Sequence, residues 1–392
     1  MKNWEGEMWC PWGNSVEKVI IEEGITSIGE YAFSGCSRLT SITIPDSVTS
    51  IGSSVFGGCS SLTNITVTND NRNYASENGV LFSKDNKKII CYPAGKKDKV
   101  YIIPDRVTSI EEWSFSGCSS LTRISISASM RGIANGAFSG CSSLIGINIP
   151  GSVTSIGEWA FSGCSSLINI SIPNSVISIG ENAFYGCSNV TIKCKSGTVA
   201  QQYAMSNNIG YETDDVAPIV EVAYSTIEAT NKDVQVTITS NEEMQTINGW
   251  ILSENRLSLT KTYISNAKEE IKVKDLVGNI TNITVEINNI DKIPAEIEVV
   301  YSTTEPTNQD VQVTIKSNEA IQRVDGWTLA KDKLSLTKTY KSNAKEKIQI
   351  KDLVGNITNA TIEINNIDKL PAVIEVIYST KELTNQDVQV TI

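Results

Sequence analysis

The sequence contains nine cysteines but no histidine. Without histidine, neither a Ser-His-Asp nor a Cys-His catalytic arrangement can form, and histidine-ligated metal sites are excluded. Six cysteines recur at one position of a repeated motif, and we call them the ladder cysteines: Cys36, Cys59, Cys118, Cys141, Cys164 and Cys187. No CxxC pair is present, which argues against a metal knuckle. These thiols could form disulfides between stacked turns or act as small buried apolar groups, and we expect the second.

Aspartates are the second group that could do chemistry, because Ca²⁺ is held by several carboxylate or carbonyl oxygens. Four aspartates fall near expected domain junctions: Asp275, Asp291, Asp352 and Asp368. Their spacing matches no EF-hand loop, and aspartate is common in turns without any metal. We therefore expect no metal and no cofactor, with calcium at the junctions as the open alternative. Lysine or carboxylate catalysis would need a cleft that the sequence does not indicate, so we expect no enzymatic activity.

A short repeat positions the ladder cysteines, and its period is 23, the step in residue number from Cys36 to Cys59. A phenylalanine precedes each of them at the same offset: Phe33, Phe56, Phe115, Phe138, Phe161 and Phe184. The one longer step, from Phe56 to Phe115, contains an insertion. Within one copy, Leu39, Ile42 and Ile44 form an LxxIxI string, which is the strand pattern of a leucine-rich repeat with its apolar residues pointing inwards. A repeat of this length predicts a solenoid, because one turn cannot bury its own apolar face.

The amino-acid sequence of the repeat resembles that of the BspA-type leucine-rich repeat, which is found in a family of bacterial and some protozoan surface proteins. The resemblance lies in SIGEYAFSGCSRLTSITIP (residues 27–45) and its later copies, and it spans about residues 15–211. It implies a solenoid over residues 1–213 with a long variant turn near 68–104. It also implies a helical C-terminal cap in SGTVAQQYAMSNNIGY (196–211). The N-terminal cap strands of the family are missing, so we expect the chain to begin inside a longer protein.

The second half of the chain repeats with a longer period of 77, the step from Tyr224 to Tyr301. YSTIEATNKDVQVTI at Tyr224 returns at Tyr301 and Tyr378 with few changes. Short alternating strands separated by Asn, Asp and Gly turns predict β-sandwiches. These units resemble tandem bacterial immunoglobulin-like domains, and Trp250 and Trp327 stand where that fold buries a tryptophan. The expected domains are 214–291, 292–368 and a truncated third module over 369–392, which indicates that this end is also cut. Short linkers containing proline predict that the modules fold separately.

Composition limits the choice of partners. The net charge of −11 argues against nucleic acid, whose binding depends on Lys and Arg neutralising phosphates. No run of 18 apolar residues could cross a membrane, and no apolar signal-peptide core follows Met1. The fold class is therefore mainly β, a leucine-rich repeat solenoid followed by immunoglobulin-like sandwiches.

The outward positions of the solenoid strands are the predicted partner-binding site. Solenoids generally bind partners on a continuous concave face, although a plain solvated sheet would have the same composition. The predicted residues are Thr40, Ser41, Thr43, Thr63, Asn64, Thr66, Thr122, Arg123, Ser125, Gly146, Asn148, Asn169 and Ser171. The second candidate is the long turn, whose distinctive residues are Tyr74, Phe82, Tyr92, Lys96, Lys97 and Lys99. Its aromatic side chains could instead pack on the neighbouring turn.

These features predict a non-enzymatic bacterial protein that is extracellular or attached to the cell surface. The resemblance implies an adhesin-like role, in which the solenoid binds a protein or glycan on host cells, extracellular matrix or other microbes. The immunoglobulin-like modules would then act as a spacer. Two alternatives remain, namely the accessory binding or spacer region of a larger exported enzyme and a structural component of the cell envelope.

Overall fold

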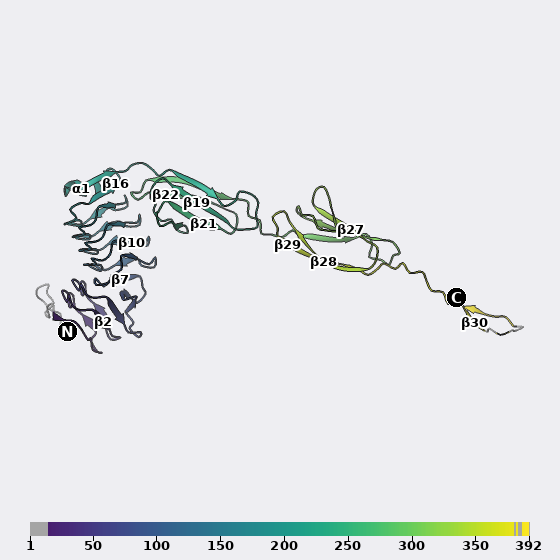
Figure 1. The fold of residues 1–392 in the computed structure, drawn as a ribbon, viewed down its shortest axis with the longest axis horizontal. Coiled ribbons are helices and arrows are strands. Elements are labelled where there is room, and N and C mark those ends of the chain that lie inside the picture. The colour runs from purple at the N-terminus through teal and green to yellow at the C-terminus, as the bar shows by residue number, and fades with distance from the viewer. Residues whose placement is uncertain (1–14, 380–381, 383–385, 392) are drawn as a thin grey trace. The chain divides into compact units, whose positions relative to one another are not determined.

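A computed structural model describes residues 15–379, 382 and 386–391. The described chain is mainly β and contains the helix α1, so the predicted β class is confirmed (Figure 1). The chain divides into two compact units. The first comprises Met1–Ala223, Val236–Lys261 and Glu269–Val285, and the second comprises Tyr224–Gln235, Thr262–Lys268 and Glu286–Ile392. No helix in the described part of the chain is long and apolar enough to span a membrane.

The repeats form the turns of a β-solenoid, as predicted. The longer strand of each turn is β2 (Ser41–Ile44), β4 (Asn64–Val67), β8 (Val100–Ile102), β10 (Arg123–Ser125), β12 (Gly146–Asn148), β14 (Asn169–Ser171) or β16 (Thr191–Cys194). The short strands on the return segments are β1 (Ser27–Ile28), β3 (Ser50–Ile51), β9 (Ser109–Ile110), β11 (Gly132–Ile133), β13 (Ser155–Ile156) and β15 (Ser178–Ile179). Strands of successive turns pair in parallel, with Ile42 opposite Ile65 and Ile124 opposite Ile147. Equivalent residues of neighbouring repeats therefore lie side by side.

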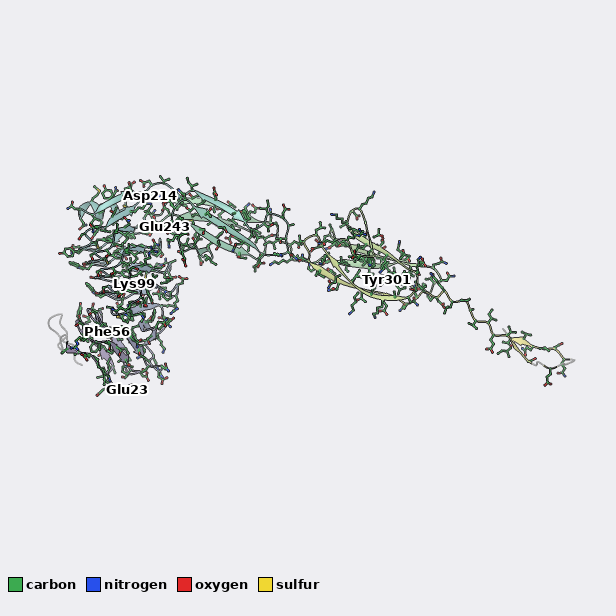
Figure 2. The ribbon with its side chains drawn as sticks, viewed as in Figure 1. Glu23, Phe56, Lys99, Asp214, Glu243 and Tyr301 are labelled. Atoms are coloured by element: carbon green, nitrogen blue, oxygen red, sulfur yellow. The ribbon has the colours of Figure 1, made fainter. Side chains whose placement is uncertain are left out.

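The interior of the solenoid is built from the residues that the pattern marks as inward-facing. Leu39, Ile42 and Ile44 are buried, and Phe33 stacks on Phe56 with 5.8 Å between ring centroids. The same stacking continues from Phe115 to Phe184 at 5.2–5.5 Å. Phe56 is labelled among these side chains in Figure 2. Apolar burial across turns is the main source of stability for such a stack.

The ladder cysteines are buried beside these rings. The Sγ of Cys141 lies 3.2 Å from the backbone oxygen of Phe115 on the preceding turn, and the Sγ of Cys164 lies at the same distance from that of Phe138. Cys187 repeats the contact with Phe161 at 3.1 Å. Each thiol therefore donates a weak hydrogen bond along the stack in addition to filling space.

The insertion between Phe56 and Phe115 completes one further turn and adds a hairpin. Tyr92 stands one repeat before Phe115 and stacks on it at 5.2 Å, so a tyrosine occupies the phenylalanine position of this turn. The hairpin consists of β5 (Tyr74–Glu77) and β6 (Val80–Ser83), and β7 (Lys88–Cys91) then pairs in parallel with β9.

The outward strands do not form the single continuous sheet that we expected. One sheet contains β2 and β4, and another contains β8, β10, β12, β14, β16 and β17 (Gly210–Thr213). The backbone N–H of Ile65 in β4 donates to the carbonyl oxygen of Gly79, which belongs to the hairpin turn. The hairpin thus satisfies a donor of β4 that would otherwise pair with the next strand, and this interrupts the sheet.

Helix α1 (Val199–Ser206) follows β16 and contacts β15, β16 and β17. Its small residues Ala200 and Ala204 are buried, and Tyr203 packs edge-on against Phe184 at 6.0 Å. The helix falls inside the segment that the resemblance assigns to a closing helix. The segment does not end there, because β17 extends the six-stranded sheet by pairing with β16.

The second half forms two similar β modules. The first contains β18 (Val220–Tyr224), β19 (Val234–Ser240), β20 (Ile251–Leu252), β21 (Ser258–Tyr263), β22 (Ala267–Lys274) and β23 (Ile280–Ile287). The second contains β24 (Ile297–Tyr301), β25 (Val311–Ser317), β26 (Thr328–Leu329), β27 (Ser335–Tyr340), β28 (Ala344–Lys351) and β29 (Ile357–Ile364). Each has one sheet of four strands and one of two. A short pair, β30 (Ile377–Tyr378) and β31 (Val390–Thr391), follows.

The core of the second module matches the alternating pattern of its strands. Val311, Val313 and Ile315 are fully buried, as predicted. Trp327 is buried with them, and its ring lies edge-on to Tyr340 at 6.5 Å.

Candidate functional site

The strands of the solenoid place most of the predicted partner-binding residues on their outward face. Ser41 and Thr43 lie on β2, and the other strand residues are Asn64, Thr66, Arg123, Ser125, Gly146, Asn148, Asn169 and Ser171. The paired register aligns them in rows, with Arg123 opposite Gly146 and Ser125 opposite Asn148. Because the sheet is interrupted, the residues of β2 and β4 are separated from the rest.

Three predicted threonines precede the strands, and two of them have a structural role. The hydroxyl of Thr63 donates to the carbonyl oxygen of Thr40 at 3.2 Å. The hydroxyl of Thr122 donates in the same way to the backbone carbonyl oxygen of Lys99 at 2.9 Å. These side chains link one turn to the next, which is a structural reason for threonine to recur at this position.

Sequence reasoning missed two residues on the outward face. Strand β8 aligns Val100 with Arg123 and Ile102 with Ser125. Val100 is 56% exposed and Ile102 is 69% exposed. The signal was weak, because β8 lies in the long turn and does not carry the repeated LxxIxI string. The face therefore carries apolar residues beside its polar ones.

The long turn is a structural feature of the solenoid. Phe82 and Tyr92 are buried, and the Tyr74 hydroxyl accepts a hydrogen bond from the Ile51 backbone N–H at 2.8 Å. The Lys96 ammonium lies 3.4 Å from Asp98 and 5.9 Å from the centre of the Tyr92 ring. The aromatic side chains thus pack on neighbouring turns, as the alternative to a binding role for this segment predicted.

Residues of the first β module contact the ends of the solenoid turns within the first unit. The backbone N–H of Gly151 donates to Oε1 of Gln245 at 3.1 Å. With its amide oriented by the hydrogen-bond network, Asn148 accepts from the Arg256 guanidinium at 3.2 Å. Burial lowers the pKa of Arg256. One predicted partner-binding residue, Asn148, is therefore already engaged within the chain.

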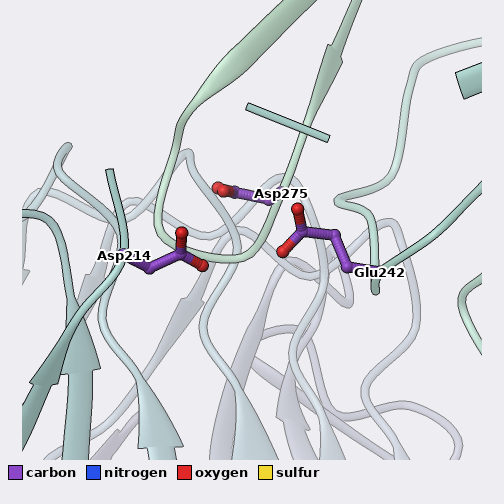
Figure 3. Close-up of side chains that lie close together, drawn as sticks. All are labelled: Asp214, Glu242 and Asp275. Atoms are coloured by element: carbon purple, nitrogen blue, oxygen red, sulfur yellow. The ribbon is translucent and has the colours of Figure 1, made fainter. Parts of the chain in front are cut away.

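Three carboxylates from distant segments meet near the end of β22 (Figure 3). The carboxylate oxygens of Asp214, Glu242 and Asp275 lie within 4.8 Å of one another. Asp275 is buried, and its Oδ1 accepts from the backbone N–H groups of residues 277–279. The Lys193 ammonium lies 2.9 Å from Asp214. Burial, followed by the charges of Asp214 and Asp275, raises the pKa of Glu242.

The same cluster recurs one module later as Asp291, Glu319 and Asp352. Such a set of oxygens could bind a hard cation or share a proton. The sequence analysis named Asp275, Asp291 and Asp352 but missed their partners, although the longer period relates the two sets. Asp368 lies outside both clusters and accepts from the Leu370 N–H at 3.0 Å.

The comparison with protein families agrees with this solenoid. The BspA type leucine rich repeat region matches residues 11–94 and 91–212 in six copies. A leucine-rich repeat protein from Eubacterium ventriosum is 33% identical, with a TM-score of 0.42, over 44% of this chain and 46% of its own. A leucine rich cell surface protein from Faecalibacterium prausnitzii is 29% identical, with a TM-score of 0.37, over 50% and 62%. The pneumococcal vaccine antigen PcpA is 21% identical, with a TM-score of 0.39, over 49% and 66%.

The match covers less than two thirds of each of these chains. A comparison with curated proteins found no match. The family match extends over more than half of the sequence and coincides with the stacked turns of the structure. This chain belongs to the BspA-type leucine-rich repeat family.

Proposed function

We propose that this chain is a non-enzymatic, adhesin-like binding protein of the bacterial cell surface or its surroundings. The observation that carries the proposal is the outward face of the six-stranded sheet. There the exposed apolar side chains of Val100 and Ile102 lie beside Arg123 and Ser125. Apolar residues next to an arginine are typical of the centre of a protein interface, whereas a plain solvated sheet has no need of them.

The repeat supports the proposal, because it separates packing from recognition. The inward residues Ile124, Ile147 and Ile170 are identical and buried. Their outward neighbours differ from turn to turn, from Arg123 to Gly146. The face can therefore change its partner without disturbing the core.

The β modules are proposed to be immunoglobulin-like spacers, and α1 to be the closing cap of the solenoid. The two modules have the same strand order and nearly the same sequence. Near-identical modules suit a spacer, because each copy lengthens the protein without adding a new binding surface. Family membership favours an extracellular or surface location. The partner would be a protein on host cells, extracellular matrix or other microbes.

The test is the double variant Ile102→Ser and Arg123→Ala in the full chain. The measured quantity is binding to epithelial cells and to surfaces coated with fibronectin or collagen. We expect binding to fall at least about tenfold while the melting temperature stays close to that of the wild type, because each exposed substitution changes stability by only about 0.5 kcal/mol.

The matched control is Ile177→Ser, which removes an equally exposed isoleucine before β15, outside the six-stranded sheet. This variant should bind like the wild type. Unchanged binding by the double variant would contradict the proposed interface.

A further inference from the structure

A groove of about 350 Å³ opens beside helix α1, at the end of the solenoid that α1 and β16 mark in Figure 1. Its walls come from the loop that contains Tyr185 and from the residues between α1 and β17. The volume falls within the range of small-molecule sites, about 300–1,000 Å³. The groove is distinct from the outward strand face, since none of the predicted partner-binding residues lines it.

The lining combines aromatic rings with uncharged polar groups. Tyr185 and Tyr203 supply the rings, and Asn182, Asn207 and Asn208 supply side-chain amides. None of the twelve lining residues is charged, although the chain carries a net charge of −11. Without a lysine, arginine or carboxylate to pair with, an ionic ligand would lose its hydration without compensation. The groove is therefore suited to a neutral ligand.

The amides are available for such a ligand. In the part of the chain that the structure describes, the side chains of Asn182 and Asn208 make no hydrogen bond. Asn207 donates to the Tyr203 carbonyl oxygen at 2.9 Å, which leaves its own oxygen as an acceptor. An amide both donates and accepts, and a sugar hydroxyl does the same, so the two are complementary.

An exposed aromatic surface extends from the groove. Tyr185 is 65% exposed, and Trp159 lies edge-on to it with 5.6 Å between ring centroids. Trp159 also has a left-handed backbone, with φ of 57°, which costs a bulky residue about 1 kcal/mol or more. The equivalent positions of the other turns carry Tyr31, Ser54, Trp113, Gly136 or Asn182, all with positive φ. The turn itself therefore does not require an aromatic residue there.

We propose that this groove, together with Tyr185 and Trp159, binds the end of a neutral glycan. The apolar C–H faces of a pyranose ring would pack on Tyr185, and its hydroxyls would bond the amides of Asn182 and Asn208. Acidic sugars are disfavoured by the missing cations and by the negative end of the α1 dipole beside the groove. This site is independent of the protein interface proposed above.

The experiment titrates the full chain with maltotetraose, cellotetraose, chitotetraose, lactose and 3′-sialyllactose, using calorimetry and saturation-transfer NMR. We expect at least one neutral sugar to bind, and sialyllactose to bind more weakly than lactose. Tyr185→Ser and Trp159→Ser should each weaken the binding by at least about tenfold, which corresponds to about 1.4 kcal/mol. Serine is a safe replacement, because other turns carry Ser162 and Ser54 at these positions.

The matched control is Trp113→Ser, which removes the tryptophan at the position equivalent to Trp159 but far from the groove lining. It should bind like the wild type. A further variant, Asn208→Gly, removes one amide while tolerating the positive φ of 53° and should also weaken binding. The proposal is overturned by no binding of any neutral sugar, by unchanged binding in Tyr185→Ser, or by tighter binding of sialyllactose than of lactose.

Discussion

At the residue scale, the ladder cysteines show how a repeated position acquires a structural role. From Cys59 onwards, each thiol points its Sγ at a carbonyl oxygen of the preceding turn, as Cys141 does to Phe115. Burial raises the pKa of Cys118 well above its ordinary value, so its reactive thiolate is scarce. The hydrogen bond from Cys164 lowers the pKa of Cys187, but that thiol is buried and shielded from reagents. A disulfide between neighbours would give up these contacts and would need a geometry that parallel side chains rarely reach.

We therefore predict that the ladder cysteines are reduced and do not react in the folded protein. Maleimide labelling in native buffer, read by mass spectrometry, should leave all six unmodified, whereas labelling in denaturant should modify every cysteine. Cys91 is half-buried as a residue, but burial of its sulfur also raises its pKa, so it should react slowly as well. A mass corresponding to a Cys141–Cys164 or Cys164–Cys187 bridge would refute this assignment.

Glu242 gives a second prediction at this scale. Its folded-state pKa is raised above the ordinary value of 4.5, so the folded protein binds this proton more tightly than the unfolded chain does. Stability is therefore lost as the pH rises through these pKa values, and the loss persists at neutral pH. Glu242→Gln should raise the free energy of unfolding by up to about 0.5 kcal/mol at pH 7.

At about pH 3, where the wild-type carboxyl is protonated, the gain should disappear. Chemical denaturation at the two pH values checks this. Glu254→Gln, at an exposed site, is the control and should have no effect at either pH. A stabilisation by Glu242→Gln that is equal at both pH values would show that charge is not the cause.

At the scale of the elements, the turns fit together through one close contact between repeats. Gly136 has a φ of 58°, and a Cβ placed on it would lie 2.4 Å from the Trp113 ring of the preceding turn. The tryptophan thus covers the glycine, and each residue type depends on the other. This is a pairing between neighbouring repeats that no local propensity requires.

We predict that Gly136→Ala destabilises the solenoid by about 1–3 kcal/mol, because it adds a clash to a strained backbone. In the double variant with Trp113→Ser the clash is removed, and the cost of the alanine should fall to about 1 kcal/mol. Urea denaturation of the four proteins of the cycle measures the coupling. Additive effects of the two substitutions would mean that the ring moves aside freely.

Sequence patterns predicted those elements whose residues repeat. Phe33, Leu39 and Ile42 were placed correctly, because inward packing forces the same apolar type into every turn. The turn of Tyr92 was hidden, because tyrosine replaces phenylalanine there and the hairpin lengthens the spacing. The exposed residues of β8 were missed for the same reason. The lining of the groove at Tyr185 comes from residues brought together only by folding, which a periodic pattern does not reveal.

At the scale of the whole molecule, residues of the first β module contact turns of the solenoid. Gln245 reaches Gly151 with its side chain, and the backbone N–H of Asn174 donates to the Val277 carbonyl oxygen at 3.0 Å. Both contacts join residues that a linear succession of independent modules would leave apart. The module therefore restricts part of the outward face, where Arg256 engages Asn148.

We predict that these contacts persist in solution and can be lost one at a time. In the full chain, the Gly151 and Asn174 amides should exchange with deuterium slowly, because each is held by a hydrogen bond to the module. Gln245→Ala removes the acceptor of Gly151 alone, so the Gly151 amide should exchange faster while Asn174 stays protected. The Thr154 amide, which bonds Arg131 within the solenoid, serves as the internal reference. Fast exchange of both Gly151 and Asn174 in the wild type would show that the module is not held against the solenoid, and the whole face would then be open to a partner.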